Sequence, residues 1–431
     1  MLEKARDFFQ RSLKSEPVQN FLVYGLGALF LKGVSFFLLP FYTKFLSPSE
    51  YGQVELINTL VVFVSTLVAL GLPSYMFMEY FQVKEEGRSQ FLKDIVGIYL
   101  LVSTPFFLVL IIILFLFSRI FIPVGVKPLT INIAMAYAYI LFFQSLYVNI
   151  LIILKKAKTV TLYRVIIGAG TILANIYLIY ILRIGITGVF LSLLVLTFIS
   201  FLYPILSNWE EIRQFSFNIN PKFIRSTLKI GSILMVGYLA YFGLNFVDRW
   251  FILYFLGEEK VGIYSLAFKF SSVLEALLIS PALSVYSVYI YPKFAKGQFD
   301  QKIILLSTGV LTVFFVLGLI IQPIARFMIN PKFYESLGLI IPLVMGYAFY
   351  FLSQINSLVI LFSKDSRKLL VNISLAFLAN ISLNYFFLKY LSLNGAAYAF
   401  LFSNFLWFLI SIFQSNLVKR KLAINNTLNH S

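Results

Sequence analysis

The stretch FLSPSEYG, residues 45–52, joins two long apolar runs, and it recurs as FLGEEKVG at residues 255–262. Both copies begin with Phe-Leu, carry acidic residues in the middle and end on a glycine. A second match, LANI, occurs at residues 173–176 and again at residues 378–381. Two matches in the same order, with nearly equal separations, predict that the chain is an internal duplication.

The runs around these motifs are apolar enough for lipid to cover them. Of the 431 residues, 60% are hydrophobic and only 12% are charged, whereas a soluble protein of this length needs a polar surface. Each run reaches about twenty residues, which crosses ~30 Å of hydrocarbon at ~1.5 Å per residue. We therefore predict an all-α, polytopic membrane protein of about twelve transmembrane helices, at residues 20–45, 53–80, 92–118, 129–154, 161–183, 185–207, 229–256, 261–291, 302–328, 337–362, 369–391 and 393–417.

The duplication sets how these helices divide. Six helices per copy is an even number, so both copies cross the membrane in the same orientation. Parallel repeats of this kind are related by an axis along the membrane normal. We therefore predict two six-helix lobes related by a pseudo-twofold axis along that normal. The predicted divisions are a cytoplasmic N-terminal segment (1–19), an N-lobe (20–207), a cytoplasmic linker (208–228), a C-lobe (229–417) and a cytoplasmic tail (418–431).

The net charge of +17 predicts orientation rather than a nucleic-acid partner, because the basic residues lie in short clusters between the apolar runs. Every loop on the side of the N-terminus carries at least three Lys or Arg, and every loop on the other side carries at most two. The positive-inside rule then predicts that both termini are cytoplasmic, in a multi-pass protein of the cell membrane.

The sequence lacks the residues that metal sites and ATP hydrolysis usually require. Cysteine is absent and the single histidine, His430, is in the tail, which excludes thiolate and histidine metal sites. No phosphate-binding loop for ATP occurs in the sequence. We therefore expect no catalytic residues, no metal and no cofactor, apart from a coupling H⁺ or Na⁺.

Several short motifs carry a family resemblance. They are FLLP (37–40) continuing into residues 45–52, Gly71-Leu72, Asp248-Arg249 followed by residues 255–257 and 262–265, and residues 394–397 (NGAA). Their order and spacing resemble the polysaccharide-biosynthesis flippases of the O-antigen repeat-unit type, within the multidrug/oligosaccharidyl-lipid/polysaccharide exporter superfamily. The resemblance implies a fold like that of its MATE exporters, with two lobes around a central cavity lined by helices 1, 2, 7 and 8, and transport by alternating access.

Ionisable residues inside the predicted spans select the same four helices independently. Each would cost on the order of 3 kcal/mol if it faced lipid at the bilayer centre, so each must face protein, water or another charge. The other eight predicted helices have no ionisable residue at comparable depth. The six residues are Lys32, Glu55, Asp248, Arg249, Lys269 and Glu275.

These six residues have two interpretations. In the first they line a substrate cavity, where Lys32, Arg249 and Lys269 meet the diphosphate of a lipid-linked oligosaccharide. Glu55, Asp248 and Glu275 then balance the cations when the cavity is empty, and one of them carries a coupling proton or Na⁺. In the second they are permanent ion pairs that lock the lobes, and for Asp248 beside Arg249 both interpretations stand. Nearby polar residues could bond sugar hydroxyls or join helices, namely Tyr241, Asn245, Tyr264, Gln53 and Asn58.

The leading hypothesis is a flippase that moves a polyprenyl-diphosphate-linked oligosaccharide to the outer leaflet. Its expected partners are that substrate, membrane lipids and the polysaccharide polymerase machinery. The first rival is a multidrug or small-solute cation-coupled antiporter of the same superfamily, and the balance of three cations against three anions disfavours it mildly. The second rival is a membrane-embedded glycosyltransferase or polymerase. The loops are short for such an enzyme.

Overall fold

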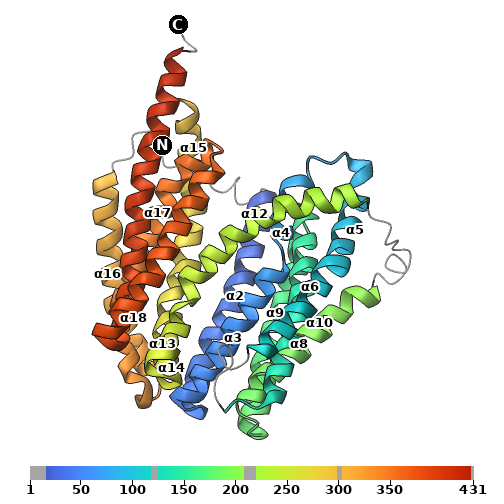
Figure 1. Cartoon of the computed structure of the whole chain (residues 1–431), viewed down its shortest axis with the longest axis vertical. Coiled ribbons are helices and arrows are strands. Elements are labelled where there is room, and N and C mark those ends of the chain that lie inside the picture. The colour runs from blue at the N-terminus through green and yellow to red at the C-terminus, as the bar shows by residue number, and fades with distance from the viewer. Residues whose placement is uncertain (1–15, 118–124, 208–219, 299–302, 429–431) are drawn as a thin grey trace, which may run out of the picture. The chain divides into compact units, whose positions relative to one another are not determined.

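The computed structural model describes residues 16–117, 125–207, 220–298 and 303–428. Every regular element in these ranges is a helix (Figure 1). Nine helical segments in them are long and apolar enough to cross a membrane. The predicted all-α, polytopic architecture is confirmed. The predicted N-terminal segment 1–19 lies almost wholly outside the described residues, as does most of the predicted linker.

The contacts within the chain group it into two compact units. The first unit comprises Met1–Leu38 and Ile57–Met235, and the second comprises Leu39–Leu56 and Val236–Ser431. The first helical hairpin, residues 39–56, therefore packs with the second half of the sequence. Three helices pass from one unit to the other, because the boundaries fall inside α2, α3 and α12.

The first unit is built around α8 and α10, which pack along each other, with α9 against both. Two of its spans contain a π-helical segment, η2 and η3. Its helices are the first part of α2 (Glu16–Phe45), the second part of α3 (Pro48–Val68), α4 (Leu72–Glu79), η1 (Glu85–Gly87), α5 (Arg88–Ile98), η2 (Tyr99–Ser103), α6 (Thr104–Leu116), α8 (Pro128–Ile153), α9 (Ala157–Asn175), η3 (Ile176–Ile181), α10 (Ile186–Ser207) and the first part of α12 (Pro221–Phe246).

The second unit is built around α17, which packs against α14, α16 and α18. The apolar window of α17 is 67% buried, against 17% for α16, so α17 lies at the centre of the unit and α16 at its edge. The remaining helices are α13 (Asp248–Leu256), α14 (Glu258–Leu274), the π segment η4 (Glu275–Ile279), α15 (Ser280–Ala295), α16 (Ile303–Met328), η5 (Pro331–Ser336), α17 (Leu337–Phe362) and α18 (Ser366–Leu428).

The helices account for all the predicted spans. The long α18 breaks at Ser392, where φ is 53° and ψ is −140°, so it contains both predicted spans 369–391 and 393–417. The helices α2 and α10 coincide with the first and sixth predicted spans. The other eight predicted spans match the remaining eight apolar segments one to one, and the ninth segment is α18 itself.

One helix begins earlier than the sequence predicts. The predicted span starts at residue 229, whereas α12 begins at Pro221. Asn220 caps this helix, because its side-chain oxygen accepts a hydrogen bond from the backbone N–H of Lys222 at 2.9 Å. Proline is favoured at the first helical position, where its missing N–H costs nothing. An Asn-Pro pair in a polar stretch thus starts a helix where we predicted a linker.

The second sequence match corresponds to a repeated contact. Asn175 in α9 donates to the side-chain oxygen of Ser192 in α10 at 2.8 Å. Asn380, its counterpart in the first part of α18, donates to the side-chain oxygen of Ser403 in the second part at 3.1 Å. All four side chains are buried. Both copies of LANI therefore join the fifth helix of a half to its sixth.

Candidate functional site

The turn between α2 and α3 fixes where Glu55 falls. The backbone N–H of Glu50 donates to the hydroxyl of Ser47 at 3.2 Å, and the backbone N–H of Ser47 donates to the carboxylate of Glu50 at 2.8 Å. This reciprocal pair is a capping box, and Pro48 follows as the first helical residue. The SPSE part of the repeated motif thus starts α3 at a defined residue.

The matching turn in the second half uses a glycine instead. Gly257 has φ of 85°, a conformation that residues with a side chain rarely adopt, and it separates α13 from α14. Glu258 then begins α14 and accepts hydrogen bonds from Gln53 at 2.6 Å and from Ser49 at 3.3 Å. These bonds tie the start of α14 to the start of α3.

The two helix starts cross at the glycines that end the repeated motifs. A Cβ added at Gly52 would lie 2.0 Å from the carbonyl oxygen of Glu258, and one added at Gly262 would lie 2.0 Å from that of Pro48. The contact is reciprocal, as a pseudo-twofold relation between the two copies requires. Residues at helical spacing from the glycines share their face, so the crossing brings Glu55 toward Lys269.

Glu55 and Lys269 form an ion pair, with the Lys269 Nζ 2.7 Å from the Glu55 Oε1. The same ammonium donates to the hydroxyl of Tyr51 at 3.3 Å. The Glu55 side chain is 8% exposed and the Lys269 side chain is 29% exposed. The carboxylate is therefore enclosed by protein, while the cation can still be reached.

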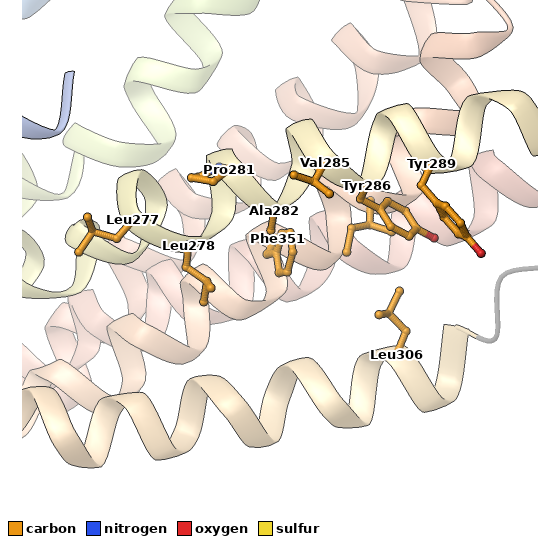
Figure 2. A pocket seen from close by; sticks show the side chains of 10 residues that line it. Leu277, Leu278, Pro281, Ala282, Val285, Tyr286, Tyr289, Leu306 and Phe351 are labelled. Atoms are coloured by element: carbon orange, nitrogen blue, oxygen red, sulfur yellow. The ribbon is translucent and has the colours of Figure 1, made fainter. Parts of the chain in front are cut away.

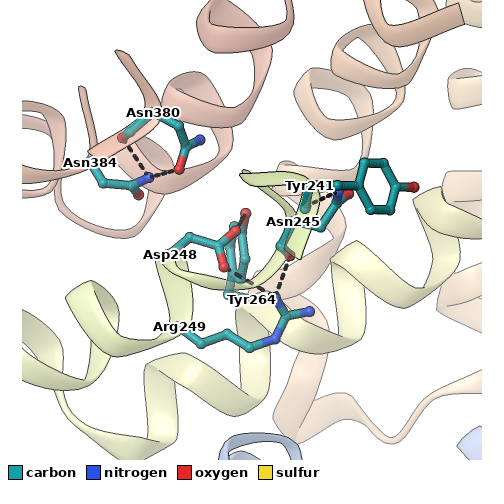
Figure 3. A network of polar contacts seen from close by, with 7 residues as sticks. All are labelled: Tyr241, Asn245, Asp248, Arg249, Tyr264, Asn380 and Asn384. Atoms are coloured by element: carbon teal, nitrogen blue, oxygen red, sulfur yellow. Dashed lines mark hydrogen bonds and ion pairs between the residues drawn. The ribbon is translucent and has the colours of Figure 1, made fainter. Parts of the chain in front are cut away.

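Asp248 and Arg249 form a second ion pair, which is enclosed on both sides. The Arg249 Nη1 lies 3.1 Å from the Asp248 Oδ1 and donates to the carbonyl oxygen of Asn245 at 2.8 Å (Figure 3). That carbonyl belongs to the last turn of α12, so the guanidinium also caps the helix end. The second Asp248 oxygen accepts a hydrogen bond from the hydroxyl of Tyr264.

Aromatic rings surround the Arg249 guanidinium. Its central carbon lies 4.9 Å from the ring centre of Phe246 and 4.7 Å from that of Phe268, which are cation–π distances. Both side chains of the pair are at most 3% exposed. Among the described residues, the Arg249 Nε has no hydrogen-bond partner. This guanidinium thus keeps an unused donor in an apolar enclosure.

Glu275 pairs with a hydroxyl rather than a cation. The hydroxyl of Tyr241 in α12 donates to the Glu275 Oε1 at 2.6 Å. Glu275 is the first residue of the π segment η4. Such segments interrupt the regular hydrogen-bond ladder and occur often at functional sites.

The structure brings five of the six predicted residues into the second unit. Glu55, Asp248, Arg249, Lys269 and Glu275 all lie there. Lys32 lies on α2 in the first unit, and its side chain is outside the described part of the chain. Four of the five polar neighbours form hydrogen bonds to these charges or at the helix crossing. Within the described part of the chain, the Asn58 side chain forms no hydrogen bond. The connected ones are Tyr241, Asn245, Tyr264 and Gln53.

Sequence reasoning missed the aromatic side chains of this site. Tyr51 lies four residues before Glu55 and Phe246 lies three residues before Arg249, and both spacings place them on the same helix face as the charge. That spacing could have identified them. Phe268 could not have been found in this way, because it reaches Arg249 only through the packing of α13 on α14.

The site has the residue types that bind an anion or move a proton. No group of three or more His, Cys, Asp or Glu side chains that could hold a metal ion occurs among the described residues. The site itself contains one enclosed cation (Arg249), one reachable cation (Lys269) and three carboxylates.

Comparisons with known proteins give a family and a fold. A profile of the family described as polysaccharide biosynthesis protein matches residues 18–298. No curated protein sequence matches the chain. The structure is similar to that of the lipid II flippase MurJ in an inward closed conformation, with a TM-score of 0.73, 17% identity, and coverage of 94% of this chain and 91% of that one.

Two further similar structures are exporters of the MOP superfamily. An inward-facing multidrug resistance MATE family transporter has a TM-score of 0.69 at 14% identity, covering 92% of this chain and 95% of that one. A MOP superfamily transporter from Pyrococcus furiosus has a TM-score of 0.60 at 15% identity, covering 95% of this chain and 97% of that one. At these identities the likeness establishes the fold, and it confirms the predicted MATE-like architecture.

Proposed function

The chain belongs to the polysaccharide biosynthesis protein family and has the fold of MOP superfamily transporters, and from that premise we propose that it flips a polyprenyl-diphosphate-linked oligosaccharide across the cell membrane. The sugar head is carried past the charged residues of the second unit while the lipid tail stays in the bilayer. The two units rearrange relative to each other during transport, so that the site opens to each side in turn. The chain is a transporter in this proposal and catalyses no covalent step.

The Glu55–Lys269 ion pair is the observation that best supports this function. An ionised pair within a transmembrane helix is costly to keep, because hydrophobic residues of similar volume are often as stable or more so. Lys269 remains partly exposed while its carboxylate partner is enclosed. A diphosphate can therefore approach the ammonium and replace Glu55 as its anion. Lys269 would pair with the diphosphate only while the substrate is bound, and with Glu55 at other times.

Arg249 has a different role in the proposal. Its charge acts on Glu55 as well as on Asp248, so it adds to the positive potential around the exchange site. Its unused Nε donor is suited to a phosphate oxygen that enters the enclosure when the helices rearrange. We propose that Lys269 makes the first contact with the substrate and that Arg249 strengthens it.

The test compares two lysines on the same helix. Lys269→Gln removes the reachable cation. Lys260→Gln removes a lysine at the start of α14, which forms an exposed ion pair with Glu335 of η5. Transport of a fluorescent lipid-linked oligosaccharide is measured in proteoliposomes with matched protein amounts. Lys269→Gln should slow transport about tenfold, because one charge-assisted bond to phosphate is lost, and Lys260→Gln should leave it within about twofold.

Two results would contradict the proposal. One is normal transport by Lys269→Gln and by Arg249→Ala, with normal protein levels, which would remove the charged site from the mechanism. The other comes from cells that lack the chain. If their drug tolerance changed while their surface polysaccharide did not, the chain would be a small-solute antiporter.

We also propose that both termini face the cytoplasm. The sequence contains no cysteine, so a single introduced cysteine can be labelled without background. Ser366→Cys lies at the start of α18, close to three basic residues that predict the cytoplasmic side of the membrane. Glu259→Cys lies at the start of α14, on the predicted opposite side of the membrane. A membrane-impermeant thiol reagent should label Glu259→Cys in intact cells and label Ser366→Cys only after lysis. The reverse pattern would invert the topology.

The coupling ion stays a prediction. We propose that protonation or Na⁺ binding at Asp248, Glu55 or Glu275 drives the cycle. Transport into proteoliposomes under an imposed pH or Na⁺ gradient separates the two ions, and the carboxylate-to-amide variants of these residues should identify which one responds. Equal rates with and without either gradient would show that no ion is coupled.

A further inference from the structure

Glu275 differs from the other two carboxylates of the charged site in its partners. Glu55 and Asp248 each pair with a cation, whereas Glu275 forms no ion pair among the described residues. Its one hydrogen bond within them comes from the Tyr241 hydroxyl, which bonds to Oε1. The residue is half-buried, so the second carboxylate oxygen is left open. This oxygen can accept hydrogen bonds from a ligand.

The open side of Glu275 is shared with Lys269. The half-buried residues of this stretch recur every three or four positions, at Lys269, Ser272, Glu275 and Ala276. That spacing places them on one side of the helix. A carboxylate that faced lipid near the bilayer centre would cost on the order of 3 kcal/mol, so this side is expected to meet water or a polar ligand. Lys269 and Glu275 are separated by about 9 Å along the helix axis at ~1.5 Å per residue.

Two aromatic side chains flank the open carboxylate. Tyr241 of α12 and Tyr350 of α17 are half-buried, and their ring centres lie 6.2 Å apart. The charge of Glu275 acts on both tyrosines. The buried ring of Trp407 supports Tyr350 from behind, at 5.6 Å between ring centres. The Tyr241 ring points away from Arg249 (Figure 3), so these tyrosines lie on a separate part of the charged site.

A carboxylate between tyrosine rings matches the two surfaces of a hexose. One face of a sugar ring is rich in C–H groups and packs on an aromatic ring, while its edge carries hydroxyl donors. Hydroxyls that leave water need hydrogen-bond partners, and an ionised carboxylate accepts stronger hydrogen bonds than a neutral group does. Tyrosine adds apolar contact area together with a hydroxyl of its own. The negative charge of Glu275 repels an acidic sugar, so the arrangement favours a neutral one.

Tyrosines elsewhere in the second unit lack this partner. Figure 2 shows Tyr286 and Tyr289 in an apolar groove of about 660 Å³ along α15. No carboxylate occurs in the described lining of the groove, and the Tyr289 hydroxyl instead accepts a hydrogen bond from Lys293 at 2.7 Å. Tyr289 is therefore a tyrosine bonded to a charge of the opposite sign, and it provides a matched control.

We propose that Glu275, Tyr241 and Tyr350 bind the first sugar of the lipid-linked oligosaccharide, and that this sugar is a neutral hexose. The diphosphate is then at Lys269, and the separation along the helix is about the length of a diphosphate with its attached sugar. This inference rests on the proposed function and names the class of sugar that the site accepts. It assigns Glu275 to the substrate, which leaves Asp248 and Glu55 for the coupling ion.

Three probes with the same lipid tail separate the sugar from the rest of the substrate. They are undecaprenyl diphosphate without a sugar, with glucose and with glucuronic acid. Equilibrium binding of each radiolabelled probe to the full chain is measured in nanodiscs. The wild type should bind the glucose probe about tenfold more tightly than the bare diphosphate, because hydrogen bonds to a charged group are strong. The glucuronic acid probe should bind no more tightly than the bare diphosphate.

Variants should change the preference for glucose and the total affinity separately. Glu275→Gln and Tyr350→Ala should each lower the preference to about threefold or less, while binding of the bare diphosphate stays within about twofold of the wild type. Glu275→Gln should also let the glucuronic acid probe bind as tightly as the glucose probe. Lys269→Gln should weaken all three probes about tenfold and keep the preference. The control Tyr289→Ala should leave every value within about twofold.

Two results would overturn the inference. One is a wild type that binds the glucose probe and the bare diphosphate equally. The other is a tenfold preference that persists in Glu275→Gln, a substitution of equal size that keeps the fold even where Tyr350→Ala does not. If tetraphenylphosphonium bound instead, and Glu275→Gln abolished that binding, the carboxylate would serve a cationic solute.

Transport of the complete substrate tests the proposed function separately. If the preference for glucose depends on Glu275 but no oligosaccharide is moved, the sugar site stands and the flippase proposal fails. If transport proceeds and depends on Lys269, while Glu275→Gln changes neither the preference nor the rate, the sugar site alone fails.

Discussion

Asp248 with Arg249 and Glu55 with Lys269 are two ion pairs in the same unit, and they differ in what can reach them. In the first pair both side chains are at most 3% exposed, and three aromatic rings lie around the guanidinium. In the second pair the lysine is 29% exposed. Both pairs consist of one cation and one carboxylate, so charge alone cannot assign their roles.

The difference in access separates the two interpretations of the buried charges. A pair sealed from water loses nothing to solvent competition and holds its geometry, so Asp248–Arg249 is suited to a fixed structural and electrostatic role until the helices rearrange. A pair with one reachable member can exchange that member's partner for another anion. Glu55–Lys269 is therefore suited to a ligand. The chain uses one pair of each kind, and variants of each pair should differ accordingly.

The largest effect should follow from breaking the sealed pair. Asp248→Asn keeps the size of the side chain but leaves the Arg249 charge buried without its partner. Loss of one member of a buried pair typically costs about 3–5 kcal/mol, because the remaining charge cannot be solvated. The free energy of unfolding, measured in bicelles by detergent titration, should fall by this amount.

Glu55→Gln is the matched change in the reachable pair. Lys269 can turn toward water, so the cost should be about 1.5–3 kcal/mol, the contribution of one charge-assisted hydrogen bond. If the two variants were equally destabilised, exposure would not be what separates the pairs. If Asp248→Asn were the milder one, the assignment of roles would be reversed.

The contact between the starts of α3 and α14, which positions the Glu55–Lys269 pair, should be the next most sensitive to substitution. Gly52→Ala would place a Cβ 2.0 Å from the carbonyl oxygen of Glu258, so the starts of α3 and α14 must move apart. Overpacking of this kind costs about 1–3 kcal/mol, and here it also separates Glu55 from Lys269. Transport should fall together with stability.

The control for this change is Gly309→Ala, which makes the same substitution in a helix where a Cβ meets nothing within 4 Å. It should be neutral or slightly stabilising, because alanine favours the helix more than glycine does. Gly52→Ala with wild-type stability and transport would show that the crossing does not fix the ion pair.

The sequence allows the spans and the confinement of the charges to be predicted, because both depend on local properties. A run of about twenty apolar residues must be a span whatever its neighbours are. The LANI repeat predicts equivalent positions, and Asn175 and Asn380 make equivalent bonds. The break at Ser392 also falls between two predicted spans, because polar residues interrupt the apolar run there.

The pairing of the charges could not be predicted in the same way. Which carboxylate pairs with Lys269 depends on where α3 crosses α14. That crossing depends on the contact between Gly52 and Gly262. The sequence repeat shows that these two glycines are equivalent, but it does not show that they are in contact. Neighbours in sequence such as Asp248 and Arg249 lie on different helix faces, and they pair because the arginine side chain is long enough to turn back. The π segments leave no signal, since their altered hydrogen bonds need no particular residue.

The smallest effect should come from a pair more exposed than either of these two. The Lys368 Nζ lies 2.9 Å from the Asp365 Oδ2 at the turn before α18, and both side chains are about one-third exposed. The bond from Lys368 holds the pKa of the Asp365 carboxyl below its ordinary value. A depressed folded-state pKa means that this pair stabilises the fold above the unfolded pKa of about 4, and that the contribution is lost as pH falls through the folded pKa.

Asp365→Asn should therefore lower the free energy of unfolding by less than about 1 kcal/mol at pH 7, the usual range for an exposed pair, and by progressively less as the pH falls below the unfolded pKa of about 4. High salt should remove the difference as well, because exposed charges are screened. Unfolding titrations of both proteins at pH 7 and pH 3, each at low and high salt, measure this directly. A loss at pH 7 as large as that of Asp248→Asn would mean that access to solvent does not set the strength of these pairs. The distinction between the sealed pair and the reachable pair would then have no energetic basis.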